Sequence, residues 1–378
     1  MTNRIVDGLD WFASGQNTAT RQMLFAANGW YAYGQQLSDP CDVITGAFGF
    51  GKAFLYDKTV GSFSSYTNGY VIPIGVSVSE GFVGFHYYRY DDSFFGQPGM
   101  VCFFDAVNNQ CQVSICFEDY GIIKVWRGFR PNGTSPSTAD LLGTSAVGAY
   151  QDGEQFHVEA YVKVDSTDGE VEVRINTAQK VSIVGSNTKG SSGSSVADSL
   201  WIGACQTAVS GVHATHYWLD NLFFNDTAGT INNDWLGNVR VKTQFMIANG
   251  PHISFSIGGS SPAATNWQSV QNTLLDGTKF VYSGTVGNYD LYDPDPNLNA
   301  PLVHSLQIRG ALWQDDATQR VAKYLVQIAG VDYDAPTSFY TNQTPTFYKD
   351  RMEVNPATSA GWTGADVNGL YAGVKVEA

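Results

Sequence analysis

The sequence predicts an all-β protein made of two tandem β-sandwich domains with jelly-roll-like strand patterns. Residues 154–184 contain two runs in which apolar and polar residues alternate, separated by a turn-forming segment. Short apolar segments recur at intervals of about ten residues, with glycine and other turn residues between them. The chain also holds 40 Gly, 20 Tyr and 22 Phe, which favours strands over helices.

The alternating runs within residues 154–184 predict one long antiparallel hairpin. A period of two in apolar residues places one face of each strand on a core and the other face in water. Between the runs, residues 165–169 supply Asp, Ser, Thr and Gly for a turn. The apolar positions are Phe156, Val158, Ala160, Val162, Val164, Val171, Val173 and Ile175. Burial of one face requires a second sheet, and we expect Glu159, Glu170 and Glu172 to lie on the wet face.

Strand patterns also occur on both sides of this hairpin. The expected strands of the first domain are 44–54, 69–78, 81–90, 99–104, 111–117, 121–129, 199–204 and 216–226. Those of the second domain are 235–245, 252–258, 279–283, 302–313, 320–329 and 337–348. Because the composition changes at 227–234, we place the two domains at 1–230 and 231–378.

Two short helices are expected in the second domain. Residues 266–272 predict a single helical turn. Residues 363–370 predict a short helix in which Thr363 is the N-cap and Asp366, three residues later, completes a capping-box arrangement. A final strand follows this helix.

Charge and hydropathy restrict the class of protein. The net charge of -14 and the pI of about 4.7 argue against a nucleic-acid partner, because phosphate binding needs clustered basic side chains. No segment approaches the roughly twenty apolar residues of a membrane helix. The first ten residues contain no apolar h-region. We therefore expect no membrane insertion, no signal peptide and assembly in a cytoplasm.

The cysteine pattern argues against zinc and thioredoxin-type sites, because no C-x-x-C pair is present. The five cysteines are Cys41, Cys102, Cys111, Cys116 and Cys205. We expect buried reduced thiols in a reducing compartment. A disulfide between Cys102 and Cys111 is the alternative.

Two groups of segments resemble known protein families. The motifs 156–165 (FHVEAYVKVD), 169–175 (GEVEVRI) and 218–226 (WLDNLFFND) resemble laminin-G/concanavalin-A-like jelly rolls, in which a closing D-x-L strand follows a long central hairpin. The second half resembles the C-terminal region of tailed-bacteriophage virion proteins that carry such a jelly roll at their N-terminus. The matching segments are 234–241 (DWLGNVRV), 265–270 (TNWQSV), 276–283 (DGTKFVYS), 287–292 (GNYDLY) and 355–376.

The resemblance to phage proteins implies a structural role in the virion, on the tail, on a fibre or as a decoration of the capsid surface. It implies other virion proteins as partners and a symmetric homo-oligomer such as a trimer. The expected location is the virion, after assembly in the host cytoplasm. A host-surface glycan is a further expected partner.

The concanavalin-like fold also hosts glycan-cleaving enzymes. Retaining glucanases hold two carboxyl groups roughly 5 to 5.5 Å apart, typically on an E-x-D-x-x-E or E-x-D-x-E strand, and no such segment occurs here. Glu170 and Glu172 share a strand face, but a solvated charged face explains them. We therefore expect no enzymatic activity and no catalytic residues. A glycan-cleaving enzyme and a free carbohydrate-binding module are the alternatives.

One segment carries candidate glycan-binding residues. Tyr88, Tyr90, Asp91 and Asp92 combine aromatic faces with carboxylates, and proteins use this combination to stack on sugars and to hydrogen-bond their hydroxyl groups. The alternative is an ordinary amphipathic strand with Tyr88 and Tyr90 on its outer face or at a subunit contact.

The densest acidic loop of the sequence carries the candidate metal ligands. Asp290, Asp293 and Asp295 lie within six residues of one another, and clustered carboxylates on loops can bind Ca²⁺. The neighbouring prolines and asparagine equally fit a plain turn. Calcium is the only cofactor that the sequence suggests.

Overall fold

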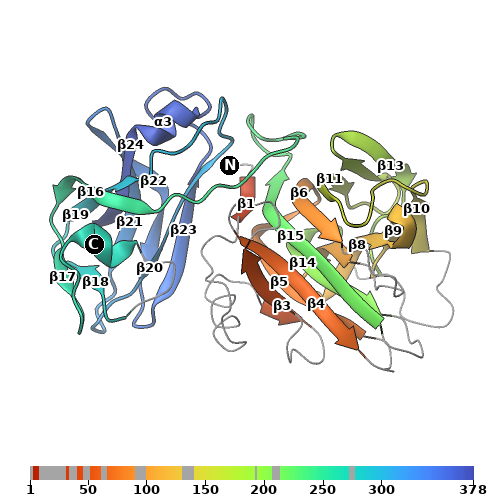
Figure 1. Cartoon of the computed structure of the whole chain (residues 1–378), viewed down its shortest axis with the longest axis horizontal. Helices are drawn as coiled ribbons and strands as arrows, with labels where there is room; N and C mark the ends of the chain where they lie inside the picture. The colour runs from red at the N-terminus through yellow and green to blue at the C-terminus, as the bar shows by residue number, and fades with distance from the viewer. Residues whose placement is uncertain are drawn as a thin grey trace. The chain divides into compact units, whose positions relative to one another are not determined.

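The computed structural model of the chain describes residues 3–7, 31–33, 41–45, 52–60, 66–89, 99–129, 140–191, 194–206, 213–271 and 277–378. These residues form many strands and only short helices, so the predicted all-β class is confirmed. The chain divides into two compact units, Met1–Val241 and Lys242–Ala378, each built from layered sheets (Figure 1). No helix in the described part is long and apolar enough to span a membrane.

The first unit contains two large antiparallel sheets, which we call the hairpin sheet and the opposing sheet. In the hairpin sheet the strand order is β13 (Ala178–Ser186), β12 (Gly169–Ile175), β11 (Gln155–Lys163), β6 (Glu80–Arg89), β15 (His213–Asp226), β4 (Lys52–Val60) and β3 (Cys41–Thr45), and β1 (Asn3–Asp7) also pairs with β15. In the opposing sheet the order is β10 (Leu141–Thr144), β9 (Ile122–Arg127), β8 (Gln110–Glu118), β7 (Gly99–Asp105), β14 (Ala197–Gln206), β5 (Tyr66–Val78) and β2 (Tyr31–Tyr33). A 3-10 turn, η1 (Asp119–Gly121), joins β8 to β9.

The core of the first unit lies between these two sheets. The apolar face of the predicted hairpin is fully buried there, with Val158, Ala160, Val162, Val171 and Val173 all 0% exposed. Aromatic rings connect the layers: Phe85 of β6 meets Phe117 of β8 edge-on at 6.1 Å, and Phe103 of β7 meets Phe224 of β15 at 5.8 Å between ring centroids. The hairpin is therefore a structural centre of the sandwich, as its period of two predicts.

Three of the cysteines belong to the buried apolar side chains of the opposing sheet. Cys102, Cys111 and Cys116 are free thiols with exposed fractions of 2% or less. Burial, as expected, is confirmed for these three, and in the structure Cys102 and Cys111 are not joined by a disulfide. The side chains of Cys41 and Cys205 lie outside the described residues.

The second unit is a smaller β structure with its own core. Its main sheet runs in the order β16 (Met246–Ile253), β19 (Tyr289–Pro294), β24 (Leu370–Val376), β21 (Val321–Ile328) and β22 (Val331–Tyr340). The other elements are the strand pair β17 (Ser256–Gly258) and β18 (Phe280–Tyr282), the pair β20 (Leu306–Leu312) and β23 (Thr346–Met352), and the helices α2 (Asn266–Val270) and α3 (Gly364–Asn368). Trp362, 0% exposed, fills the core and donates its indole N–H to the Met352 carbonyl at 2.9 Å.

Both predicted helices of the second unit are present. Thr363 caps α3: its hydroxyl accepts the Asp366 N–H at 3.2 Å, and the Asp366 carboxylate accepts the Thr363 N–H at 2.8 Å. This reciprocal pair is the predicted capping box. The boundary between the units differs from the expectation, because it follows Val241 rather than residue 230. Residues 234–241 belong to the first unit because they lie across its hairpin sheet, as the contacts described below show.

Candidate functional site

A polar pocket lies beside β8, β9 and β10 in the described part of the first unit. Its volume is about 420 Å³, within the range of roughly 300–1,000 Å³ that is usual for small-molecule sites. Its walls come from the start of β8, the end of β9, the residue before β10 and the loop 187–191 that follows β13. The side chains that line it include Arg127, Phe129, Asp140, Asn187, Lys189 and Ser191.

The loop 187–191 is held in place by β8. Gln112 is 0% exposed, and its side-chain oxygen accepts the Gly190 N–H at 2.7 Å. Gln110 donates its amide to the Ser191 hydroxyl at 2.8 Å. Gly190 has no room for a side chain, because a Cβ there would lie 2.6 Å from the Cys111 carbonyl oxygen. These contacts fix the loop before any ligand arrives.

Thr188 ties the same loop to the turn of the central hairpin. Its hydroxyl donates to the Lys163 carbonyl at 2.7 Å and accepts the Asp165 N–H at 2.9 Å. The next residue, Lys189, donates its backbone N–H to the Asn187 side chain at 3.1 Å. The backbone that carries the Lys189 ammonium group is therefore fixed on both sides.

The opposite wall of the pocket carries an ion pair. Arg127 donates through Nε and Nη2 to one oxygen of Asp140, Oδ1, at 3.1 and 2.6 Å. Within the described residues, Asp140 Oδ2 and Arg127 Nη1 make no hydrogen bond. Gly128 adopts a left-handed φ of 76°, which ends β9 and leads into Phe129. The Phe129 ring packs edge-on against Trp201 at 5.4 Å.

This arrangement suits the recognition of a small polyhydroxylated molecule. Around this pocket lie an aromatic ring and, counting partners only in the described part of the chain, a carboxylate oxygen and a guanidinium N–H that make no hydrogen bond. Side chains that are held before binding lose little conformational freedom when a ligand arrives.

A second polar cluster lies on the outer face of the hairpin sheet. Glu159 of β11, expected in water, is only 2% exposed. Its carboxylate accepts the backbone N–H of Leu236 at 2.6 Å and that of Gly237 at 3.1 Å. The expectation of a fully wet charged face is therefore wrong at Glu159, because the segment 234–241, which we call the strap, covers it. Burial raises the pKa of Glu159 to about 7, opposed by these two N–H groups.

Two histidines lie beside Glu159 under the strap. His86 of β6 and His157 of β11 are cross-strand partners with ring centroids 5.2 Å apart. His86 Nε2 lies 2.9 Å from the Asn238 side-chain oxygen. Burial lowers the pKa of His157 to about 4, and the neighbouring His86 adds to this effect. Burial also lowers the pKa of His86, opposed by the Asn238 hydrogen bond and reinforced by Arg240.

Aromatic contacts hold the strap at its N-terminal end. The Arg174 guanidinium of β12 lies 3.6 Å from the centre of the Trp235 ring, and the Phe82 ring meets Trp235 edge-on at 5.1 Å. Val241 donates its N–H to the Asn221 side chain at 2.7 Å. The strap is therefore bound along its length by strands β6, β11, β12 and β15.

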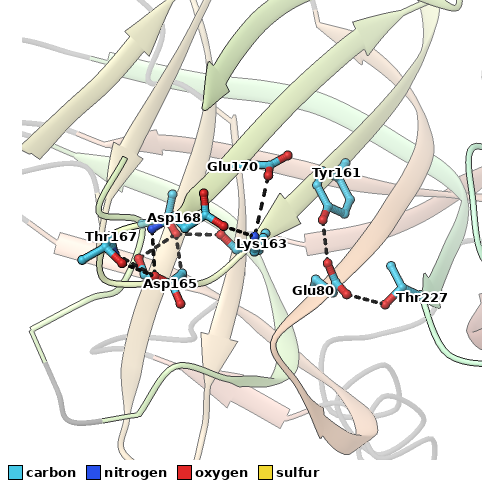
Figure 2. A network of polar contacts seen from close by, with 9 residues as sticks. Glu80, Tyr161, Lys163, Asp165, Thr167, Asp168, Glu170 and Thr227 are labelled. Atoms are coloured by element: carbon cyan, nitrogen blue, oxygen red, sulfur yellow. Dashed lines mark hydrogen bonds and ion pairs between the residues drawn. The ribbon is translucent and has the colours of Figure 1, made fainter. Parts of the chain in front are cut away.

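The turn end of the hairpin sheet carries a further group of charged residues. Figure 2 shows Lys163 between Asp168 and Glu170, with N–O distances of 2.6 and 3.7 Å. The Tyr161 hydroxyl donates to Glu80 at 2.6 Å. Glu170, which was also expected on the wet face, is more exposed than Glu159, because 36% of its side chain is accessible to solvent.

Of the predicted glycan-binding residues, the structure describes Tyr88, which does not line the polar pocket. Tyr88 is on the outer face of β6, where its ring stacks on Trp218 at 4.7 Å. Tyr90, Asp91 and Asp92 lie outside the described residues. The polar pocket is formed by other strands, so the sequence-based candidates do not include its side chains.

The predicted calcium ligands are not brought together. Asp290 is 0% exposed, and its carboxylate accepts hydrogen bonds from the Ser254 N–H, the Phe255 N–H, the Asn266 amide and the Tyr292 hydroxyl at 2.7–2.8 Å. Asp293 and Asp295 take no part in this network. Among the described residues, no three or more His, Cys, Asp or Glu side chains form a group that could hold a metal ion.

Sequence reasoning missed the pocket because its residues are far apart in the chain. Arg127 and Asp140 flank a polar loop, and Lys189 begins a Gly/Ser segment that reads as an ordinary surface loop. The available signal was Gln110 and Gln112, two amides at the start of an apolar strand, where buried polar groups need partners.

No family model matches the chain, and no curated protein matches its sequence. Solved structures with a similar arrangement include alginate lyase Aly36B, which is 14% identical, with a TM-score of 0.37 over 59% of this chain and 96% of that one. The carbohydrate-binding module CBM66 from Bacillus subtilis is 9% identical, with a TM-score of 0.32 over 53% of this chain and 96% of the module. A carbohydrate esterase of the Shiga toxin-encoding bacteriophage phi24B is 15% identical, with a TM-score of 0.34 over 52% of this chain and 89% of the esterase.

These neighbours are carbohydrate-binding or glycan-active proteins, and they correct one expectation. The inference that the chain is not an enzyme is contradicted, because alginate lyases are among the structures of similar fold. The missing glucanase motif excludes only one kind of glycan chemistry. At 11–14% identity the likeness concerns the fold and assigns no lyase residues to this chain.

Proposed function

We propose that this protein binds glycan in the polar pocket of its first unit and does so as a component of a tailed-phage virion. Glycan binding in the pocket and location in the virion rest on different observations, and different experiments test them.

The Arg127–Asp140 pair in the pocket is the observation that carries glycan binding. Among the residues that the structure describes, each partner keeps one group without a hydrogen bond, Nη1 of Arg127 and Oδ2 of Asp140. Adjacent sugar hydroxyls both donate and accept hydrogen bonds, so a neighbouring donor and acceptor can bind two of them at once. Phe129 adds an apolar surface for the C–H face of a sugar ring.

Glycan binding is tested with the full chain on an array of oligosaccharides, followed by calorimetric titration of those that bind. Asp140→Asn removes the acceptor charge while keeping the size of the side chain, and we expect it to weaken binding about tenfold. Asp168→Asn is the matched control, because Asp168 pairs with Lys163 outside the pocket lining. Binding that Asp140→Asn leaves unchanged would contradict this site.

The virion part of the proposal is supported by the resemblance of 234–241, 265–270, 276–283, 287–292 and 355–376 to phage virion proteins. The partners are then other virion proteins, a second copy in a symmetric homo-oligomer such as a trimer, and a glycan of the host surface. Mass spectrometry of purified particles tests the location. Absence of the protein from intact virions would overturn this part and leave glycan binding standing.

A further inference from the structure

We infer that the ligand of the polar pocket is a carboxylated sugar, with the Lys189 ammonium group binding the carboxylate. The Arg127–Asp140 pair binds neighbouring hydroxyl groups of the same residue. This inference rests on the proposed glycan-binding function and names the class of sugar that the site selects.

The side chains that line the pocket carry a net positive charge. Its lining holds two cationic side chains, Arg127 and Lys189, and one carboxylate, Asp140. The pocket is therefore net positive on a chain whose net charge is -14. A positive hollow on an acidic protein attracts anionic ligands and disfavours neutral ones of equal size.

Asp140 does not neutralise both cations. It is engaged by Arg127 through two hydrogen bonds to a single oxygen. Among the described residues, the Lys189 ammonium makes no ion pair. Lysines elsewhere on the described sheets do so: Lys124 with Glu118, Lys163 with Asp168 and Lys375 with Asp334, at 2.6–2.7 Å.

The backbone position of Lys189 is fixed although its ammonium group has no anionic partner in the described part of the chain. Its two neighbours, Thr188 and Gly190, are both buried. Thr188 is hydrogen-bonded to β11, and Gly190 is hydrogen-bonded to β8. The Lys189 N–H also bonds to Asn187 at 3.1 Å. A cation on such a held backbone binds an anion without first ordering the loop that carries it.

The sugar class follows from combining the two halves of the site. A simple anion would satisfy Lys189 and leave the Arg127–Asp140 groups unused. A neutral sugar would satisfy the pair and leave Lys189 without a counter-charge. A sugar acid, such as a uronate or a sialate, presents a carboxylate and hydroxyls on one ring and satisfies both.

The test uses the full chain and a panel of uronate- and sialate-containing oligosaccharides, each paired with its carboxyl-reduced counterpart. We expect the acidic member of at least one pair to bind about tenfold more tightly, which is the usual contribution of one charge-assisted hydrogen bond. This preference should decline as salt rises, because the charge pair is partly open to solvent.

Lys189→Gln is the decisive variant, and Lys180→Gln, on β13 and outside the pocket lining, is its control. Lys189→Gln should abolish the preference for the acidic member, so that the acidic and reduced members of a pair bind the variant equally. Thermal unfolding of both variants checks that they fold alike.

The outcomes separate this inference from the proposed function. Equal binding of both members, still weakened by Asp140→Asn, would overturn the carboxylate assignment and leave glycan binding in this pocket. A preference that survives Lys189→Gln would also overturn the assignment. If neither member of any pair binds, the carboxylate assignment is overturned, and the proposed glycan-binding function falls with it only when the wider oligosaccharide array also shows no binding.

Discussion

Glu159 and His157 lie two residues apart on one face of β11, and their burial shifts their pKa values in opposite directions. The pKa of Glu159 rises to about 7, and that of His157 falls to about 4. Each shift makes the stability of the fold depend on pH, because the folded and unfolded chains bind protons differently. Between about pH 4.5 and 6.5 the two dependences oppose each other.

The raised pKa of Glu159 means that the folded chain holds this proton more tightly than the unfolded chain. Its contribution to stability is complete below pH 4.5, the ordinary value, and is lost as the pH rises through about 7. Glu159→Gln removes this contribution, and the opposite pH dependence that His157 contributes is then no longer offset by Glu159. We expect the variant to lose on the order of 2 kcal/mol of unfolding free energy on acidification from pH 7 to 4.5, more than the wild type loses. Urea denaturation at a series of pH values measures this difference, and parallel profiles would contradict it.

The lowered pKa of His157 has the opposite consequence. Its contribution is complete above pH 6.5 and is lost as the pH falls through about 4, because the unfolded chain then takes up the proton. Both ring nitrogens are buried without a hydrogen-bond partner, and the ring lies nearly parallel to Phe223 at 17°. We therefore expect His157→Phe to be at least as stable as the wild type at pH 7 and to become more stable on acidification to pH 5. A loss of stability at pH 5 relative to pH 7 would show that another group controls the acid response.

Among the elements of the first unit, the strap covers part of the outer face of the hairpin sheet and thereby buries Glu159. Trp235 anchors it through the Arg174 guanidinium at 3.6 Å and the Phe82 ring at 5.1 Å. Because both contacts are on strands of the hairpin sheet, losing them loosens the N-terminal end of the strap and admits water to Glu159.

Trp235→Ala should therefore destabilise the first unit by about 1–3 kcal/mol, the sum of lost packing and of a partly buried cation–π contact. It should also bring the pKa of Glu159 down toward 4.5, because the burial that raises it is relieved. Chemical denaturation measures the first effect and NMR titration of the Glu159 carboxyl carbon the second. Trp235→Phe, which keeps a ring over Arg174, is the control and should retain most of both.

At the scale of the whole molecule, the strap decides where the first unit ends. The unit extends to Val241, and the strap supplies the N–H groups that Glu159 accepts. A chain of residues 1–241 should fold cooperatively, whereas a chain of residues 1–230 leaves Glu159, His86 and His157 uncovered. We expect the shorter chain to unfold at a lower temperature and to bind more of a hydrophobic dye than the longer one. Equal melting temperatures of the two chains would show that the strap contributes nothing to the first unit.

Features that depend on neighbouring residues were predictable from the amino-acid sequence. The period of two around Val158 and Val173 predicted the hairpin and its buried face, and the spacing of Thr363 and Asp366 predicted the cap of α3. These features hold because alternation and capping act over a few residues, where the chain order already fixes which atoms can meet.

Which polar side chains are buried, and which of them form a site, could be seen only in the folded chain. The pattern that placed Glu159 on the outer face of β11 was right about its direction, but it could not show that residues 234–241 return to cover it. The pocket likewise joins Arg127 at the end of β9, Asp140 just before β10 and Lys189 in the loop after β13, and nothing local links them. Burial and site formation depend on contacts between distant segments, and a repeat of two residues carries no information about what lies above a sheet.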